Sequence, residues 1–418
     1  MRIRLAYGEN GLDVDLPDGR TTVVTPRHAQ PAADPMAELQ RALRAPVAGP
    51  PLRALARRGQ SVAISLCDGT RPQPRRQMIP AVLAELDGIV RLEDITILVA
   101  TGTHRSNSDA ELRAMLGDEV VESVRVVNHD ARASDTLRWV GTLGDGVPTW
   151  LNAHWLDADL RITTGFVEPH FFAGFSGGPK LVAPGLAGLD TVLTLHDAKR
   201  IGDPRATWGL IKGNPVHDDV RAIAAATGVD FALDVVLDGG QRIVAAYGGR
   251  IADMHAAACE HAKTTAMQAV PRLYDVVVTT NSGYPLDQNL YQCVKGISAA
   301  AQVVAHDGLI ICAAECRDGF PYHGSYREVL RCAASPHALL EEILARPVTI
   351  PDQWQVQVQA RIQSRARVAM HTEHLTAADL AEAHLRAAPD IAAAVAEAGH
   401  EARICVLPEG PQTIPYVA

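Results

Sequence analysis

The stretch SVAISLCDGTRP, at residues 61–72, joins a run of apolar and small residues to a polar turn. Residues 61–67 are continuously apolar or small, which is typical of a strand buried on both faces of a parallel sheet. The turn after this strand contains Asp68, Gly69, Thr70 and Arg71. Because ligands bind beyond the carboxyl ends of strands in open α/β sheets, the stretch predicts a buried strand that delivers polar groups to a ligand.

Similar runs recur along the chain and alternate with Ala- and Leu-rich segments of helical character. The clearest further strands are predicted at residues 95–100, 124–128, 160–164, 274–280 and 308–313. A hairpin is predicted from residues 235–237 and 243–246, around the turn Asp238-Gly239-Gly240. The alternation predicts the α/β class, with mostly parallel sheets flanked by helices.

The length of 418 residues exceeds an average domain of about 100–200 residues, so we expect two α/β domains. The boundary is expected near residues 262–272, where an Ala-rich helix ends before Pro271. We therefore assign residues 1–268 to the first domain and 269–399 to the second, with residues 400–418 as a candidate return to the first. A long Ala-rich helix is expected at residues 377–398, before a last strand near 403–407.

Charge and hydropathy narrow the range of partners. The chain has 39 Lys and Arg against 48 Asp and Glu, a net charge of −9, which argues against binding to nucleic acid or to anionic lipid. No segment approaches the roughly 18–20 apolar residues of a membrane span, and residues 1–5 resemble a strand rather than a signal peptide. Seven cysteines without a CxxC pair argue against a disulfide scaffold or a structural zinc site. We expect a cytoplasmic protein with small-molecule partners.

Polar, glycine-containing turns follow two more of the predicted strands. They are TGTHR at residues 101–105 and GFVEPH at residues 165–170. Since the carboxyl ends of neighbouring parallel strands meet at one edge of a sheet, we expect these turns to converge with residues 68–72. His104 and His170 are then candidates for an acid and a base on opposite faces of one substrate, although a lone histidine is more often a surface or capping residue.

The segment FFAGFSGGPK, at residues 171–180, is rich in glycine and ends in a lysine. Gly177 and Gly178 allow close approach to a ligand, Ser176 and backbone N–H groups suit a phosphate, and Lys180 can bind charge or form a covalent bond. The spacing of a Walker motif is missing, and a purely structural turn remains an alternative. Further on, His196 is either a helix residue or a metal ligand.

Two other sets of residues are candidates for binding an anion. Arg71 can form a forked pair with a carboxylate or phosphate, or a surface ion pair. On a helix, Tyr291 and Lys295 share a face, and Gln292 lies next to Lys295. This face either contacts a ligand or is simply solvated.

Taken together, these segments resemble the nickel-pincer-nucleotide-dependent lactate racemase family. The resemblance is carried by DGTRP at 68–72, TGTHR at 101–105, EPHFFAGFSGGPK at 168–180, PG at 184–185 with His196 beyond, and YPLDQNLYQCVKG at 284–296. These motifs occur in the family's order over most of the chain. Each is weak alone, but their ordered combination is highly specific.

The resemblance implies a cofactor, the nickel-pincer nucleotide Ni(II)-pyridinium-3,5-bisthiocarboxylate mononucleotide, in an active site in the cleft between a cofactor-binding catalytic domain and a domain with substrate-binding residues. It implies that His196 completes the nickel sphere and that Lys180 can attach to the cofactor as a thioamide. The other cofactor-binding residues that it implies are Asp68, Gly69, Thr70, Arg71, Ser176, Gly177 and Gly178. The substrate-binding residues that it implies are Arg71, Tyr291, Gln292 and Lys295.

The resemblance also implies a reaction, the inversion at C2 of a small 2-hydroxy acid. One of His104 and His170 takes the hydroxyl proton while hydride passes from C2 to the pyridinium–nickel unit, which leaves a planar 2-keto acid. Hydride then returns to the other face, and the opposite histidine supplies the proton. Enzymes of cofactor synthesis are the partners implied for maturation.

Three alternatives stay open from the sequence. A 2-epimerase of a sugar acid would use the same mechanism. A pyridoxal-phosphate-type enzyme would use Lys180 as a Schiff base, with the SGG turn binding the phosphate. A non-catalytic protein that binds a phosphorylated metabolite would need the turns but not the two histidines.

Overall fold

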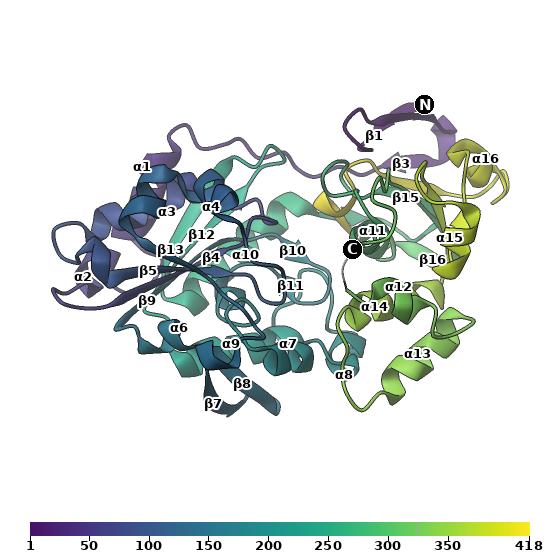
Figure 1. The fold of residues 1–418 in the computed structure, drawn as a ribbon. Coiled ribbons are helices and arrows are strands. Elements are labelled where there is room, and N and C mark those ends of the chain that lie inside the picture. The colour runs from purple at the N-terminus through teal and green to yellow at the C-terminus, as the bar shows by residue number, and fades with distance from the viewer. Residues whose placement is uncertain (323) are drawn as a thin grey trace. The chain divides into compact units, whose positions relative to one another are not determined.

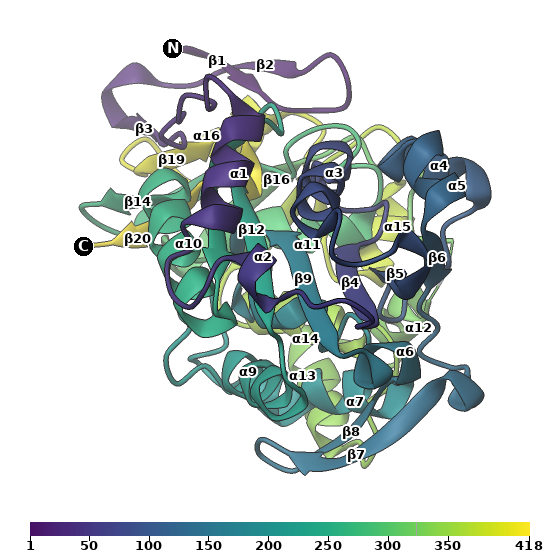
Figure 2. The same ribbon diagram turned by 90° about the vertical axis from the view of Figure 1, so that its left-hand side faces the viewer.

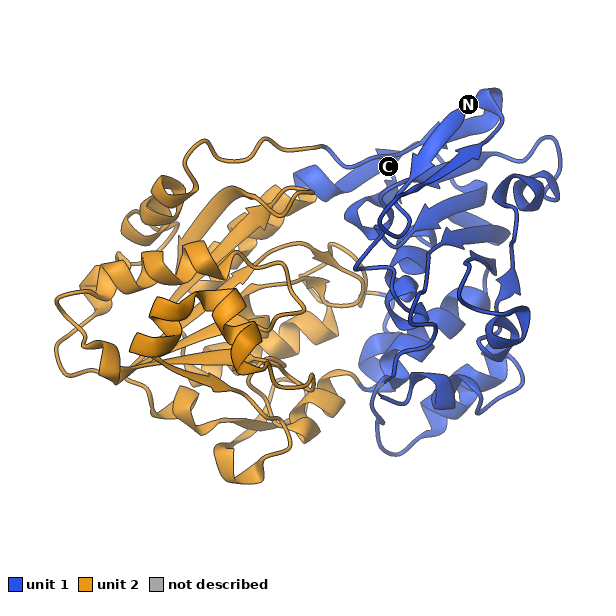
Figure 3. Ribbon diagram, turned by 45° about the horizontal axis from the view of Figure 1, so that its top comes forward, with its two compact units in different colours: residues 1–27, 197–204, 264–418 blue, residues 28–196, 205–263 orange. Residues whose placement is uncertain are grey.

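The structure, a computed structural model, describes residues 1–322 and 324–418 and divides into two compact units (Figure 3). Unit 1 comprises residues 1–27, 197–204 and 264–418, and unit 2 comprises residues 28–196 and 205–263. The elements of both units are labelled along the chain in Figure 1. The last passage between units, from Lys263 to Thr264, falls within the expected interval of residues 262–272.

Unit 2 contains a six-stranded sheet with the order β13-β12-β9-β4-β5-β6. Its strands are β4 (Val62–Cys67), β5 (Ile95–Ala100), β6 (Arg125–Asn128), β9 (Leu160–Phe166), β12 (Phe231–Leu237) and β13 (Ile243–Gly249). Every neighbouring pair is parallel except β12 and β13, which form the predicted hairpin. In its turn, Asp238 Oδ1 accepts hydrogen bonds from the backbone N–H groups of Gly240, at 3.0 Å, and Arg242, at 2.8 Å.

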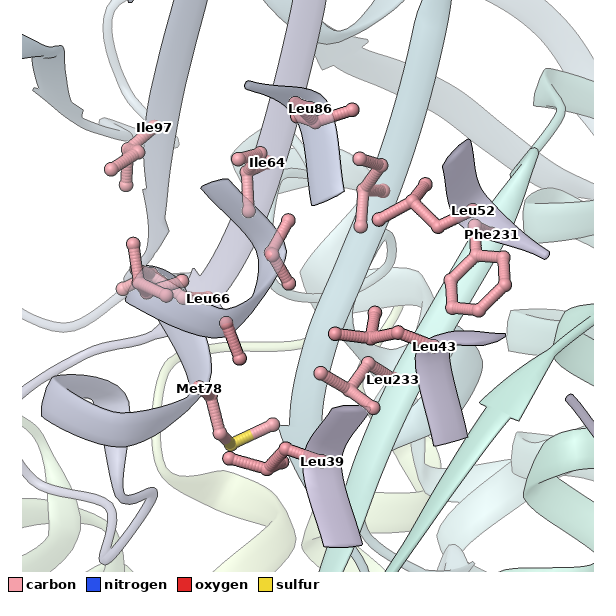
Figure 4. Packing of buried hydrophobic residues seen from close by; sticks show 14 of the residues in the cluster. Leu39, Leu43, Leu52, Ile64, Leu66, Met78, Leu86, Ile97, Phe231 and Leu233 are labelled. Atoms are coloured by element: carbon pink, nitrogen blue, oxygen red, sulfur yellow. The ribbon is translucent and has the colours of Figure 1, made fainter. Parts of the chain in front are cut away.

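Helices cover both faces of this sheet, so its strands are buried on both sides (Figure 2). On one face lie α1 (Pro35–Arg44), α2 (Leu52–Leu55), α3 (Arg75–Leu86), α4 (Asp109–Leu116) and α5 (Asp118–Ser123). On the other face lie α6 (Ala153–Asp157), α7 (Leu189–Leu195), α9 (Pro215–Thr227) and α10 (Ile251–Ala266). Strand β4 shows the period of two expected for a strand, since Ile64 and Leu66 join the first cluster (Figure 4) and Ala63 joins the second.

Smaller elements complete unit 2. An antiparallel ribbon consists of β7 (Leu137–Leu143) and β8 (Val147–Asn152), and a tight hairpin consists of β10 (Pro169–His170) and β11 (Gly174–Phe175). The 3₁₀ segments are η2 (Leu92–Asp94), η3 (Ser134–Thr136) and η4 (Gly178–Leu181).

Unit 1 contains a second six-stranded sheet, in which all neighbouring pairs are parallel. Its order is β18 (Arg386–Ala387), β17 (Arg367–His371), β16 (Val304–Ala313), β15 (Tyr274–Thr280), β19 (Ile404–Leu407) and β3 (Thr21–Val23). The other elements are α8 (Ala198–Gly202), α11 (Leu290–Ala300), α12 (Tyr326–Leu330), α13 (Pro336–Ala345), α14 (Gln353–Gln363), α15 (Ala377–Glu382), α16 (Ile391–Ala396), β1 (Arg2–Leu5), β2 (Leu12–Asp15), β14 (Met267–Val270), β20 (Ile414–Val417), η1 (Asp18–Arg20) and η5 (Gly410–Gln412).

Both ends of the chain belong to unit 1, which corrects two of the expected boundaries. The first 27 residues lie here and not with the first domain, because the β1–β2 hairpin packs on the sheet and β3 pairs with β19. The expected return of residues 400–418 to the first domain is wrong, since β19 pairs with β15. Apolar hairpin residues such as Leu5 and Val14 make the packing favourable, but the sequence pattern does not show which sheet they cover.

The long helix expected at residues 377–398 is also wrong. The structure has α15, then β18, then α16. His384 adopts a positive φ of 56°, and Ala388 donates its backbone N–H to Met370 of β17. Pro389 cannot donate a helical hydrogen bond and disfavours the helical conformation of the residue before it. These local constraints outweigh the helix propensity of alanine.

The six predicted strands are all present, at β4, β5, β6, β9, β15 and β16. Among the helices of the described residues, none combines the length and apolarity that crossing a membrane requires.

We expect Leu39→Ala to destabilise unit 2 strongly, because Leu39 of α1 is fully buried against the sheet (Figure 4). Removing its side chain leaves a cavity, and the free energy of unfolding should fall by about 2–5 kcal/mol. Chemical denaturation measures the change. The matched control is Leu92→Ala, because Leu92 is 45% exposed, and it should change the same quantity by less than about 0.5 kcal/mol. Equal losses in the two variants would contradict the assigned packing.

Candidate active site

The candidate site of unit 2 lies where its sheet changes winding direction. From β4 the chain adds β5 and β6 on one side, and it then adds β9 and β12 on the other side of β4. The loops after β4 and β9 therefore flank the topological switch point, which is where open α/β sheets bind ligands. These loops contain the residues predicted from DGTRP and EPHFFAGFSGGPK, and the next loop, after β5, contains His104.

Asp68 and His104 are in direct contact. Asp68 Oδ2 lies 2.7 Å from His104 Nδ1, and Asp68 Oδ1 accepts hydrogen bonds from the backbone N–H and hydroxyl of Thr70. Burial acts to raise the pKa of Asp68, but the contacts with His104 and Thr70 and the nearby Arg71 charge hold that pKa well below its usual range. The ionised Asp68 thus accepts from His104 Nδ1–H, which leaves the lone pair of neutral His104 on Nε2.

Arg75 holds the Asp68 turn, a role that the sequence analysis did not assign. Its guanidinium is buried and donates to the carbonyl oxygens of Cys67, Asp68, Gln73 and Arg71. Burial lowers its pKa, the direction expected for a desolvated cation. The sequence RPQPRRQ has three arginines, and no local signal distinguishes the buried one.

The His104 loop and the Lys180 loop are joined through Gly185. Gly185 N–H donates to Lys180 O at 3.1 Å, and Gly185 O accepts from Gly102 N–H at 3.0 Å. A Cβ atom on Gly185 would lie 2.8 Å from Ala100 Cβ and 2.9 Å from Lys180 O. Glycine is therefore required at this position for the two loops to approach each other.

The ring of Phe172 brings three predicted residues together. It lies edge-on to His170 at 4.5 Å and to His196 at 5.4 Å between ring centroids, and Lys180 Nζ is 5.9 Å from its centroid. Phe172 itself is 4% exposed. The predicted base, metal ligand and covalent lysine thus surround one buried aromatic ring.

His170 has its own hydrogen-bond pattern. Nδ1 accepts from the backbone N–H of Ala173 at 3.2 Å, within the turn between β10 and β11. Neutral His170 therefore carries its proton on Nε2, the opposite arrangement to His104. Because Nε2 already carries a proton, the neutral ring can accept a further proton only at Nδ1, which requires His170 to release the N–H of Ala173.

The position of His196 suits a metal ligand. It caps the C-terminus of α7, and its Nδ1 lies 2.7 Å from Val192 O, so that Nδ1–H donates and the lone pair of the neutral ring is on Nε2. A histidine that binds metal commonly donates its other N–H to a carbonyl in this way. Burial and then the charge of Lys180 lower its pKa to about 4, which keeps the imidazole neutral near pH 7.

The Gly-rich turn before Lys180 uses several of its polar groups internally. The Ser176 hydroxyl donates to Phe166 O and accepts from Glu168 N–H, each at 3.0 Å. Gly178 N–H donates to the buried Asp234, so this N–H is not available to a phosphate. Asp234 was not identified from the sequence, and its partner on the same turn, His255, was also missed.

In unit 1, the predicted substrate-binding residues lie at the switch point of the second sheet, between β15 and β19. They follow β15 on α11, where Asn289 caps the helix by accepting from Gln292 N–H at 3.2 Å. Lys295 Nζ donates to Gln292 Oε1 at 3.0 Å, which confirms that these residues adjoin on the helix. Tyr291 packs edge-on against Tyr326, with 5.4 Å between ring centroids.

Across residues 1–322 and 324–418, no group of three or more His, Cys, Asp or Glu side chains could hold a metal ion.

Loops at the switch point of a parallel sheet, with an aspartate–histidine pair and a second histidine, define this chain as an α/β enzyme. The lactate racemase N-terminal domain model matches residues 7–209, and the lactate racemase C-terminal domain model matches residues 270–414. The chain belongs to the lactate racemase family and is an isomerase of the racemase type.

Individual relatives agree with this assignment. Lactate racemase from Thermoanaerobacterium thermosaccharolyticum is 36% identical over 99% of this chain and 98% of that protein. Lactate racemase from Lactiplantibacillus plantarum is 34% identical over 89% of each. The structure of the T. thermosaccharolyticum lactate racemase apoprotein has a TM-score of 0.92 at 34% identity, covering 99% of this chain and all of that one. A Thermotoga maritima protein, with a TM-score of 0.68 at 18% identity over 93% of this chain and 100% of its own, shares the fold.

We expect Asp68→Asn to lower kcat by roughly 10²–10⁴-fold, because His104 loses the carboxylate that fixes its tautomer. Measuring bound cofactor in the variant separates this effect from cofactor loss. The substitution should also lower the free energy of unfolding by an amount that depends on pH. The lowered pKa of Asp68 means that its contribution is present above its ordinary value of 3.8 and is lost as pH falls further. The stability difference between wild type and variant should therefore be largest above pH about 4 and shrink in acid; a constant difference would contradict the pairing.

Proposed function

We propose that this enzyme inverts the C2 centre of a small 2-hydroxy acid with the help of a nickel-pincer nucleotide and two histidines. The observation that carries the proposal is the arrangement around Phe172, where His170, His196 and Lys180 meet beside the loop joined to the Asp68–His104 pair. The names of the two lactate racemase relatives support a 2-hydroxy acid as substrate. A 2-epimerase of a sugar acid remains the nearest alternative.

The residues present fit this cofactor. His196 offers a neutral Nε2 as the protein's ligand to nickel, and the remaining donors would be the cofactor's own sulfur and carbon atoms. Lys180 would form the thioamide, and the loop at residues 68–71 would bind the nucleotide, with the glycines at 177 and 178 allowing its close approach. When bound, the cofactor supplies the acceptor for hydride leaving C2.

Hydride removal suits this substrate class, because the C2–H of a 2-hydroxy carboxylate is a very weak acid next to a negative charge. His104 accepts the hydroxyl proton at Nε2, and the resulting imidazolium is stabilised by Asp68. His170, in its imidazolium form and released from Ala173 N–H, returns a proton to the keto oxygen from the opposite side. The reverse direction exchanges these roles, and proton exchange with solvent resets the pair.

Positioning of the substrate falls to cationic and polar side chains. Arg71, which adjoins Asp68, would bind the carboxylate through a forked guanidinium. We propose that Lys295, held by Gln292 on α11, is a further substrate-binding residue, with Gln292 and Tyr291 beside it. Arg71 and Lys295 contribute by orienting the substrate, since neither of these two side chains takes part in proton or hydride transfer.

The deciding experiment uses protein produced together with the enzymes of cofactor synthesis. We expect one nickel per chain, a mass increase that matches the nucleotide, and racemisation of an enantiopure 2-hydroxy acid. Inversion in D₂O should proceed without deuterium entering C2, because hydride returns to the carbon it left. Activity after complete removal of nickel, or solvent deuterium at C2, would overturn the proposal. Turnover of sugar acids alone would instead select the epimerase.

Two variants separate chemistry from cofactor retention. His170→Ala should lower kcat by roughly 10²–10⁴-fold, the usual contribution of an acid/base group, while nickel stays bound. Lys180→Ala should lower the amount of cofactor that survives gel filtration, because the covalent link is lost. Metal analysis and intact mass measure both outcomes. Full activity in His170→Ala would contradict the acid/base role, and unchanged retention in Lys180→Ala would indicate a non-covalent cofactor.

A further inference from the structure

Two buried side chains hold the turn Ser176–Gly178 from beneath, and neither has a role in the proposed chemistry. Asp234 lies on β12 and is fully buried, and His255 lies on α10 and is 4% exposed. Both contact the backbone of the turn that leads into Lys180.

Asp234 binds the turn at its tightest point. Its Oδ2 accepts from Gly178 N–H at 2.6 Å. A Cβ atom on Gly177 would lie 2.6 Å from the same oxygen, and one on Gly165 would lie 2.9 Å from Asp234 Oδ1. Gly177 and Gly178 have φ values of 73° and 49°, which favour glycine. The two glycines are thus explained by the carboxylate beneath them.

His255 binds the other end of the turn. Its Nε2 lies 2.8 Å from Ser176 O, and a Cβ atom on Gly178 would lie 2.5 Å from His255 Cδ2. Burial lowers the pKa of His255 to about 4, and the charge of Lys180 acts in the same direction, although the hydrogen bond to Ser176 O acts to raise it. The neutral ring therefore donates Nε2–H to Ser176 O. The ring of His217 stacks on it, with 5.5 Å between centroids and 13° between planes.

A buried carboxylate is costly unless something requires it. Burial raises the pKa of Asp234 to about 7, although backbone hydrogen bonds from Gly178 and Gly165 act to lower it. A simpler apolar residue would fill the same space at lower cost. Asp234 lies instead beneath the turn that leads into Lys180. The backbone N–H of Lys180 donates to Gly177 O of this turn at 3.1 Å.

We propose that Asp234 and His255 are positioning residues that clamp the Ser176–Gly178 turn and so aim Lys180 for attachment to the cofactor. This inference rests on the proposed function, in which Lys180 forms the covalent link. Neither residue touches substrate or reacting atoms, and both act through the turn.

At each of the two residues, one variant removes the contact with the turn and a conservative variant keeps it. Asp234→Ala and His255→Leu remove the contacts, whereas Asp234→Asn keeps an acceptor for Gly178 N–H and His255→Gln keeps a donor for Ser176 O. The matched control is Asp219→Ala, because buried Asp219 supports another glycine turn of unit 2 by accepting from Asp145 N–H at 2.7 Å. It should cost similar stability without reaching Lys180.

The first measurement is the covalent share of the bound cofactor, obtained by comparing native with denatured mass spectra. Asp234→Ala and His255→Leu should lower the ratio of attached to unattached cofactor about tenfold, in the range usual for residues that orient a metal site. The conservative variants and Asp219→Ala should keep the wild-type ratio. A loss of mere stability would lower total cofactor but not this ratio.

The second measurement uses cofactor-free protein, so it stands even if the proposed function fails. Lys180 is half-buried and Lys212 is exposed, and both react with acetic anhydride at rates that peptide mass spectrometry can follow. Releasing the turn should raise the rate of Lys180 relative to that of Lys212, whereas the conservative variants and Asp219→Ala should keep the wild-type ratio of rates. Should Asp234→Ala not fold, the comparison of His255→Leu with His255→Gln serves alone. Wild-type values in both measurements would overturn the proposal.

Discussion

A parallel sheet covered by helices on both faces leaves only the ends of its strands open to a ligand. Unit 2 obeys this constraint, since β4 contributes to apolar clusters on both sides and ends at Asp68. The change of winding direction at β4 and β9 then decides which loops lie beside each other. The candidate residues at 68–71, 104, 170 and 176–180 follow from this constraint, because they lie on loops after β4, β5 and β9.

Much of this could be predicted from the sequence because it is local. The strand at residues 62–67 and its polar turn are contiguous, and their apolar run and turn residues specify them directly. The contact between Asp68 and His104 follows from two neighbouring parallel strands that end together. The residues that hold these loops could not be predicted in this way. Asp234 and His255 act on a turn that is distant in the sequence, whereas Arg75 lies close to its turn, and nothing in the local sequence distinguishes any of the three from ordinary helix or strand residues.

Two predictions about the fold are wrong because contacts between segments that are distant in the sequence decide the outcome. The alanines of residues 377–398 favour a helix locally, but pairing of β18 with β17 and the presence of Pro389 decide the outcome. The N-terminal residues are assigned to the first domain by their proximity in sequence, but they form a hairpin that packs on the apolar surface of the second sheet. Local propensity is therefore reliable where the strand itself carries the signal and fails where a distant surface competes.

Three histidines of unit 2, His104, His196 and His255, differ in their hydrogen-bond partners. His196 and His255 are both kept neutral by burial, and each donates one ring N–H to a backbone carbonyl. Their surroundings differ, since the ring of His196 lies edge-on to Phe172, while the ring of His255 lies beneath the Ser176–Gly178 turn. His104 differs from both because its Nδ1 partner is a side-chain carboxylate, that of Asp68, and not a backbone carbonyl. The hydrogen bond at Nδ1 or Nε2 thus determines which ring nitrogen keeps the lone pair when each ring is neutral.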